Sequence, residues 1–192
     1  MGITTNDFFE NIYSVIFSPK AFFEREEMKI SVRLGFATVI FVSLIYNITK
    51  SVFDASIINK AFIFLLIWKI ALAVIAWFLT ALLFEFIAKI FDKDGNMNKL
   101  LFLTAFAPVP YIFFAPLNLL KHSGTFLYTV ASLLELFLYI WIIYLYTLAL
   151  KSTYNISNAR AFMLILMPFI SAFFALFWLV CFFVKLCYIF SI

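Results

Sequence analysis

Two ionisable side chains, Lys69 and Glu135, lie inside long apolar stretches of this sequence and are its strongest candidates for chemistry. Lys69 lies about eight residues into the run 61–84, and Glu135 about ten residues into the run 125–150. A charged group at bilayer depth costs at least a few kcal/mol, so it normally faces a partner or a wet cavity. If both runs are helices that cross in the same direction, the two groups reach a similar depth, about 12 to 15 Å from one boundary.

Other polar residues fall in the same half of their runs. Asn47 lies in the first run and Tyr111 in the third, while Tyr139 follows Glu135 by one helical turn. With Lys69 and Glu135 they form a predicted intramembrane polar cluster. Two interpretations stay open: a pathway for a proton, an ion or a lipid headgroup, or an internal ion pair of Lys69 with Glu135 that fixes helix register. We prefer the ion pair because nothing else in the sequence marks a substrate.

The elements that must position this cluster are long apolar segments. The chain has 192 residues, of which 66% are hydrophobic. A helix needs about 20 apolar residues to cross a bilayer. The runs that qualify are 33–53, 61–84, 100–120, 125–150 and 161–183. They predict one transmembrane domain, 33–192, of five helices, with kinks at the Pro residues of the third and fifth.

The predicted fold class is an all-α integral membrane protein. Strands of a membrane barrel would alternate apolar and polar residues, whereas these runs are apolar on every face. Nine Lys and Arg lie on the side of the N-terminus and of the second and fourth gaps, against four on the other side. The positive-inside rule therefore predicts a cytoplasmic N-terminus and a C-terminus outside.

Residues 1–32 are predicted to form short amphipathic helices in the membrane interface. Phe8 and Phe9 begin a series of apolar residues at helical spacing, and the opposite face is polar. Ser18 and Pro19 fit the N-cap and first position of a second helix, which Phe22 and Phe23 would anchor. The four Phe residues named here are the predicted interface anchors.

Two short motifs carry a resemblance to the Yip domain family, polytopic proteins whose eukaryotic members interact with Rab or Ypt proteins. Residues 17–24, Phe-Ser-Pro-Lys-Ala-Phe-Phe-Glu, look like the N-terminal Ser-Pro-Lys-x-x-Phe element of that family. Residues 91–99, Phe-Asp-Lys-Asp-Gly-Asn-Met-Asn-Lys, resemble its Gly-containing loop, which leads into a helix with internal Pro. The chain has no counterpart of the eukaryotic Asp-Leu-Tyr-Gly-Pro stretch and looks more like the compact prokaryotic members.

The resemblance implies five spans with the N-terminus inside and a non-enzymatic scaffold or adaptor that organises the membrane. A small transporter, channel or lipid-moving protein that uses the Lys69 and Glu135 cluster is the alternative. The sequence has no nucleophile with a base, no phosphate-binding Gly loop and no metal-ligand spacing, so we expect no catalytic site, cofactor or metal. The expected location is the plasma or inner membrane. The expected partners are the lipid bilayer and a protein at the N-terminal segment, with no nucleic acid and with a homo-oligomer left open.

Overall fold

The computed structural model describes residues 5–25, 30–53 and 60–190 of the protein. These residues form helices joined by short turns, with no strand among them. The elements, in chain order, are α1 Thr5–Phe17, α2 Pro19–Phe23, α3 Val32–Phe53, α4 Lys60–Ile90, α5 Met97–Phe106, the 3-10 helix η1 Val109–Phe113, α6 Phe114–Lys121, α7 Thr125–Tyr154 and α8 Asn158–Phe190. The all-α prediction is confirmed.

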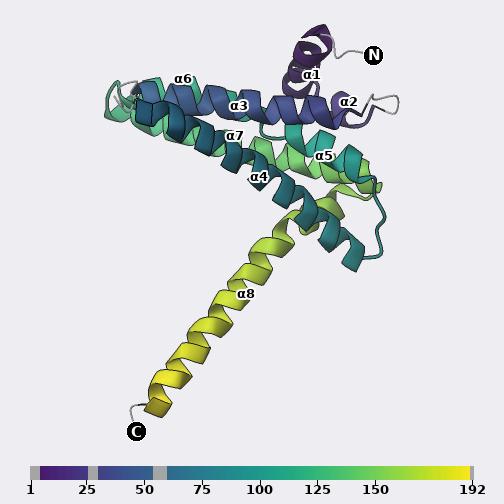
Figure 1. The fold of residues 1–192 in the computed structure, drawn as a ribbon, viewed down its shortest axis with the longest axis vertical. Coiled ribbons are helices and arrows are strands. Elements are labelled where there is room, and N and C mark those ends of the chain that lie inside the picture. The colour runs from purple at the N-terminus through teal and green to yellow at the C-terminus, as the bar shows by residue number, and fades with distance from the viewer. Residues whose placement is uncertain (1–4, 26–29, 54–59, 191–192) are drawn as a thin grey trace.

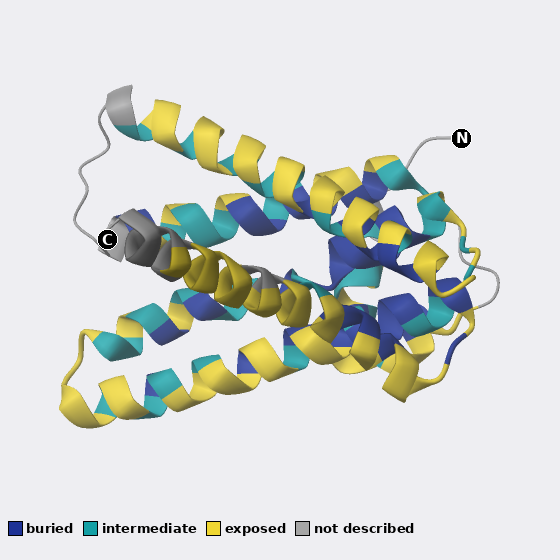
Figure 2. Ribbon diagram, turned by 90° about the horizontal axis from the view of Figure 1, so that it is seen from below, coloured by how far each residue is buried: buried dark blue, intermediate teal, exposed yellow. Residues whose placement is uncertain are grey.

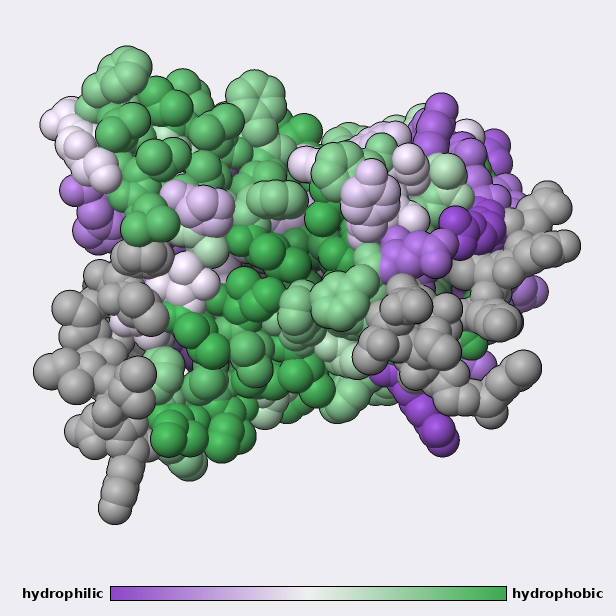
Figure 3. All heavy atoms as spheres, turned by 90° about the horizontal axis from the view of Figure 1, so that it is seen from above, coloured by the Kyte–Doolittle hydropathy of each residue, from purple (hydrophilic) through white to green (hydrophobic). Residues whose placement is uncertain are grey.

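Five segments are long and apolar enough to cross a membrane, as the sequence predicts. They are Val32–Ser51, Phe62–Ile90, Met97–Lys121, Thr125–Tyr154 and Asn158–Phe182. Figure 3 shows the expected distribution of polarity, with hydrophobic residues across the middle of the face and hydrophilic ones towards its ends. We call these the α2 end, which also carries the α4–α5 turn, and the α6–α7 turn end (Figure 1).

The third span is broken rather than merely kinked. α5 ends at Phe106, η1 begins at Val109 after Pro108, and α6 begins at Phe114. Pro108 and Pro110 supply no backbone N–H, and the ring of a Pro clashes with the preceding turn of an α-helix, so the α-helix cannot continue through them. Tyr111 therefore lies on a 3-10 turn and not on a regular helix.

α5 is the central element of the bundle. All seven residues from Leu100 to Phe106 are buried, and α5 contacts α3, α4 and α7. α3 approaches it closely at Gly35, where a β-carbon would lie 3.1 Å from that of Ala105. A glycine at this contact lets the two backbones pack without a clash, as small residues do between membrane helices. Figure 2 shows the buried residues concentrated in the half of the bundle near the α2 end.

Buried hydroxyl groups find partners within their own helices. The hydroxyls of Thr38, Thr104, Thr147 and Thr153 each donate to the carbonyl four residues earlier, at 2.7 to 2.9 Å. Among the described residues, no buried side-chain nitrogen or oxygen lacks a hydrogen-bond partner. This local pairing lets polar side chains lie inside a membrane bundle without the cost of an unsatisfied group.

The N-terminal segment folds onto the bundle, which corrects one prediction. Phe22 and Phe23 are fully buried, and the Phe22 ring lies 6.4 Å from that of Phe102 and 5.2 Å from that of Phe106, centroid to centroid. They anchor α2 to protein, so the prediction that they insert into the lipid interface is wrong. Sequence alone does not separate the two roles because both require an apolar side chain. Ser18 does stand at the N-cap of α2 with Pro19 after it, although its hydroxyl forms no capping bond.

α1 lies across the bundle instead of along it (Figure 1). Phe8 packs edge to face on Phe41 of α3, with ring centroids 5.4 Å apart, and Val15 is fully buried. Phe9 is 59% exposed, although its ring also lies 6.5 Å from that of Phe41, centroid to centroid. Phe8 thus fastens α1 to protein, and the role of Phe9 as an interface anchor stays a prediction.

An ion pair adds to the attachment of α2. The Lys151 ammonium of α7 donates to the Glu24 carboxylate directly after α2. This hydrogen bond, together with the charge of Lys151, lowers the pKa of the Glu24 carboxyl below its ordinary value. The contact joins residues 127 positions apart in the sequence and so closes the N-terminal segment against the fourth span.

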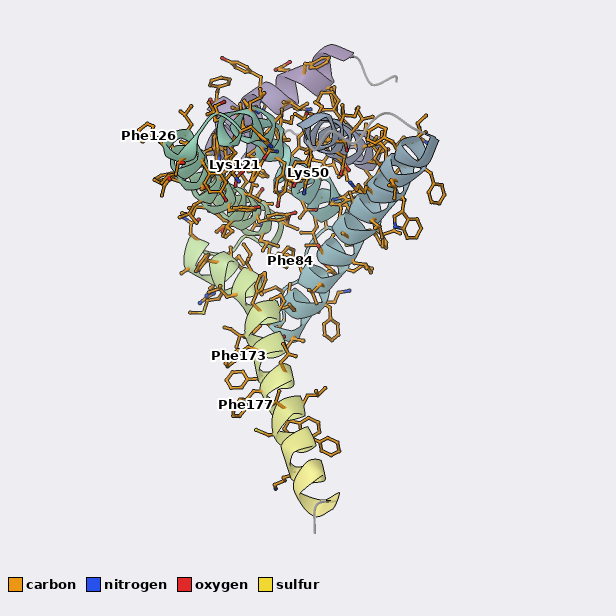
Figure 4. The ribbon with its side chains drawn as sticks, turned by 90° about the vertical axis from the view of Figure 1, so that its left-hand side faces the viewer. Lys50, Phe84, Lys121, Phe126, Phe173 and Phe177 are labelled. Carbon is orange, nitrogen blue, oxygen red and sulfur yellow. The ribbon has the colours of Figure 1, made fainter. Side chains whose placement is uncertain are left out.

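α8 departs from the other helices after its first turns. Ala161, Leu164 and Ile165 are buried against the bundle, but the described side chains from Phe169 to Lys185 are all exposed. Pro168 lies inside the helix at this transition. Figure 1 shows the C-terminal part of α8 projecting away from the bundle, and Figure 4 places Phe173 and Phe177 on this projecting part.

We predict that Phe22→Ala loosens the N-terminal segment. Truncation of a fully buried Phe typically costs about 3 to 5 kcal/mol, because a cavity remains where the ring was packed. The expected result is faster trypsin cleavage after Lys20 in the detergent-solubilised protein. Phe9→Ala is the matched control because its ring is largely exposed, and it should leave the cleavage rate unchanged. Equal cleavage rates in both variants would show that Phe22 does not hold α2.

Candidate functional site

Glu135 forms an ion pair with Lys121, the last residue of α6. The Lys121 Nζ lies 2.6 Å from the Glu135 Oε2, and the two side chains are 23% and 16% exposed. Side chains on a helix tilt towards its N-terminus, so a lysine at the C-terminal end of α6 points back into the bundle. The same ammonium lies 5.6 Å from the centroid of the Tyr128 ring. Lys121 is therefore held by a carboxylate and an aromatic ring.

This geometry replaces the ion pair proposed from the sequence. Glu135 pairs with Lys121 and not with Lys69, so the predicted pairing is wrong. Lys121 falls in the gap between the predicted runs 100–120 and 125–150, but its long side chain turns inwards and reaches Glu135. Among the residues that the structure describes, Lys69 has no ion-pair partner.

Lys69 instead borders an open cleft of about 640 Å³ between the spans. The cleft is lined by one side of α3, by α4, by the break after α5 and by α7. The polar side chains in its lining are Ser43, Tyr46, Asn47, Lys50, Lys69, Trp77, Thr80, Tyr111, Tyr139 and Tyr146. No acidic residue occurs among the described residues that line it. The cleft is therefore cationic, and its volume lies in the range typical of small-molecule sites.

Most residues of the predicted polar cluster line the cleft. Lys69, Asn47, Tyr111 and Tyr139 all line it, whereas Glu135 does not. The break at Pro108 brings Tyr111 into the wall. Its ring lies 6.4 Å, centroid to centroid, from that of Tyr139 on α7.

The lining also includes residues that the sequence does not single out, among them Lys50 and Tyr46. Lys50 falls near the end of the run 33–53 and is one of the four cations on the side opposite the N-terminus; the structure places it in the last turn of α3, where it lines the cleft. The signal that was available is the helical spacing of Ser43, Asn47 and Lys50, which places the three on one face. Figure 4, viewed onto the α6–α7 turn end, places Lys50 and Lys121 between the ribbons of α4 and α7.

The two lysines lie at different depths in the cleft. Lys50 is three residues from the end of α3, and Lys69 is nine residues from the start of α4. At 1.5 Å per residue these offsets correspond to about 4 Å and about 14 Å along the helices. The cleft thus presents one cation near the α6–α7 turn end and a second one further into the span.

Hydrogen bonds and ring contacts fix the polar walls between the lysines. The Asn47 amide donates to the Ser43 carbonyl at 2.8 Å, which holds this side chain against its own helix. The Tyr46 and Tyr111 rings lie 5.8 Å apart, centroid to centroid. Tyrosine hydroxyls can donate hydrogen bonds to phosphate or carbonyl oxygens. The cleft therefore offers both charge and neutral donors to an anion.

A second polar group lies at the α2 end and has a structural explanation. Glu85 of α4 is 3.4 Å from Lys89 one turn later, and the Tyr154 hydroxyl donates to its other carboxylate oxygen at 2.6 Å. Gly95 in the α4–α5 turn packs so closely on the Tyr154 ring that a β-carbon at this position would clash with the ring. These contacts join α4, the α4–α5 turn and α7, and Glu85 with Lys89 forms an ion pair between adjacent turns of one helix.

The chain matches a known protein-family model. The family model of the Yip1 domain matches residues 13–179. The chain belongs to the Yip1 domain family. No curated protein and no solved structure matches it. The resemblance drawn from residues 17–24 and 91–99 is therefore confirmed, and in this Yip1-domain protein both segments lie at the α2 end, where Phe22 of the first packs on α5 directly after the second.

We predict that a double-mutant cycle will detect coupling between residues 121 and 135 but none between 69 and 135. Neighbouring residues of one network typically couple by about 0.5 to 3 kcal/mol. The variants are Lys121→Met, Lys69→Met and Glu135→Gln, alone and combined, and the measurement is the free energy of unfolding in mixed micelles. Coupling between Lys69 and Glu135 as large as that between Lys121 and Glu135 would contradict the structure.

Proposed function

We propose that this Yip1-domain protein is a non-enzymatic membrane protein that binds an anionic lipid in the cleft between α3, α4 and α7. The observation that carries the proposal is the pair of lysines, Lys50 and Lys69, facing a cleft without an acidic residue in its described lining. A lysine at the depth of Lys69 is costly unless it meets an anion or water. The ion pair of Glu135 with Lys121 leaves Lys69 for such a ligand.

The shape of the cleft favours an amphiphile over a free ion. Its walls combine the polar groups above with apolar side chains of α3 and α4, among them Val39, Val42, Leu72, Ala73 and Ala76. A phosphate between the two lysines would leave the acyl chains of the same molecule along these apolar residues. Basic pockets between transmembrane helices are known to bind acidic headgroups by this combination of contacts.

We further propose that the N-terminus is cytoplasmic, in the plasma or inner membrane, as the distribution of Lys and Arg favours. In that orientation the α6–α7 turn end faces outside, and the cleft serves lipids of the outer leaflet. The protein would then bind and organise lipid from one side of the membrane. The alternative suggested by the sequence, that the protein moves lipid, would begin with the same binding of lipid in the cleft.

We predict that Lys50→Gln with Lys69→Gln weakens the binding of an acidic lipid by about thirtyfold, since each lysine near a lipid headgroup contributes about 1 kcal/mol. The protein is reconstituted into nanodiscs of phosphatidylcholine that contain a photoactivatable phosphatidylglycerol, and labelling of α3 and α4 is measured by peptide mass spectrometry. Lys185→Gln is the control because this exposed lysine lies on the projecting part of α8. Undiminished labelling in the double variant would refute the proposal, as would equal labelling by a phosphatidylcholine probe.

A second candidate function, the scaffold or adaptor typical of the family resemblance, is favoured by one surface. Phe9, Tyr13 and Phe17 follow one another at four-residue spacing along α1 and are 59%, 62% and 67% exposed. The opposite side of α1 is fastened to the bundle through Val15 and Phe8. We propose that this aromatic ridge on a fixed helix docks a protein partner, or a second copy of the chain, at the cytoplasmic leaflet.

We predict that a photo-crosslinking residue at position 13 gives a protein adduct of defined mass in native membranes. Position 173 of α8 is the control, because Phe173 is equally exposed at 66% but lies on a helix that we expect to meet lipid. Phe9→Ser with Phe17→Ser should remove the adduct at position 13. Lipid adducts alone at both positions would contradict the adaptor role and would leave the cleft proposal untouched.

A further inference from the structure

A second, smaller groove lies at the α2 end, where α8 leaves the bundle. Its volume is about 300 Å³, and it is lined by Phe91 and Lys93 of the α4–α5 turn, by Ile156 between α7 and α8, and by the first turns of α8. It shares no residue with the cleft between α3, α4 and α7. The groove is therefore an independent feature, and neither the family match nor the proposed function assigns it a role.

Two cations border this groove. Lys93 comes from the turn after α4, and Arg160 is the third residue of α8. Neither forms an ion pair with any residue that the structure describes. Asp92 and Asp94 flank Lys93 in the sequence, but both are exposed and neither lines the groove. The first turn of α8 contains no acidic residue, so the positive end of its helix dipole adds to these two charges.

The remainder of the groove is apolar. Met163 and Met167 are one helical turn apart on α8 and are 66% and 38% exposed, while Leu164 beside them is buried. Phe91, in the turn directly after α4, lines the groove with them. Flexible Met side chains adapt to irregular apolar ligands such as acyl chains. The groove thus joins a cationic end to an apolar wall that continues along the exposed part of α8.

We propose that this groove binds an anionic phospholipid of the leaflet at the α2 end, with its phosphate between Lys93 and Arg160 and an acyl chain along Met163 and Met167. Charge complementarity selects the headgroup, and the apolar wall selects a lipid over a soluble phosphate. The lipid would fill the angle between α4 and α8 and so support α8 at the point where it separates from the bundle. With the cytoplasmic N-terminus of the proposed orientation, this is a site for inner-leaflet lipid.

The test uses the full chain in phosphatidylcholine nanodiscs that contain a photoactivatable phosphatidylglycerol at low fraction. Lys93→Gln with Arg160→Gln should reduce labelling of the peptide that contains Met163 and Met167 by about thirtyfold. Labelling of α3 and α4 should stay unchanged, so failure of this inference and failure of the cleft proposal are read from different peptides. Lys20→Gln with Arg25→Gln is the matched control, because it removes one Lys and one Arg of the same end that lie outside the groove.

Three results would overturn the inference. The first is undiminished labelling of the α8 peptide in the Lys93 and Arg160 variant. The second is equal labelling by a photoactivatable phosphatidylcholine, which would show no selection of an anionic headgroup. The third is complete competition by inorganic phosphate, which would assign the cations to a soluble anion instead of a lipid. A further variant, Met167→Gln, makes the apolar wall polar without adding a charge and should also lower the labelling while Lys93 and Arg160 remain.

Discussion

The close contact between α3 and α5 is the packing interaction on which the rest of this bundle depends. Apolar helices in lipid gain little from leaving their solvent, so tight van der Waals packing decides which helices associate. Gly35 lets the two backbones approach, and the side chains of α5 from Leu100 to Phe106 are then enclosed. α2 is fastened to the same helix through Phe22. α5 is thus the element around which both the spans and the N-terminal segment are arranged.

The break after α5 makes the half of the bundle near the α6–α7 turn end more open than the half near the α2 end. At Pro108 the regular helix stops, and the chain reaches the α6–α7 turn end through a 3-10 turn and a short helix. Irregular backbone at membrane depth is tolerated where it is buried in protein or lines a cavity. Here Tyr111 on the 3-10 turn faces the cleft. The proline-rich segment after α5 therefore divides the bundle into a tightly packed half and an open half.

The charged side chains fall into two groups: those paired within the bundle and those that border the cleft or the smaller groove. Glu24, Glu85 and Glu135 each bond a lysine of the bundle, so these acids act within the structure. Lys69 and Arg160 have no such partner among the described residues and border two grooves at opposite ends. These three paired carboxylates, together with cations that border the two open sites, make those sites suited to anionic ligands. In a bilayer the most abundant ligands of that charge are the acidic lipids.

The sequence by itself determined the five spans, the helical class, the two N-terminal helices and the family. Each of these rests on local signals, such as 20 apolar residues in succession or the Ser18 and Pro19 pair, which need no knowledge of neighbours. It also identified Lys69, because a charge inside an apolar run is visible without a structure. Only the tertiary structure decided that Glu135 bonds Lys121, that Phe22 and Phe23 face protein, and that Lys50 faces the cleft. These outcomes depend on the break at Pro108 and on the direction of single side chains. In addition, a side chain that faces lipid and one that faces protein are both apolar, so the sequence pattern does not distinguish them.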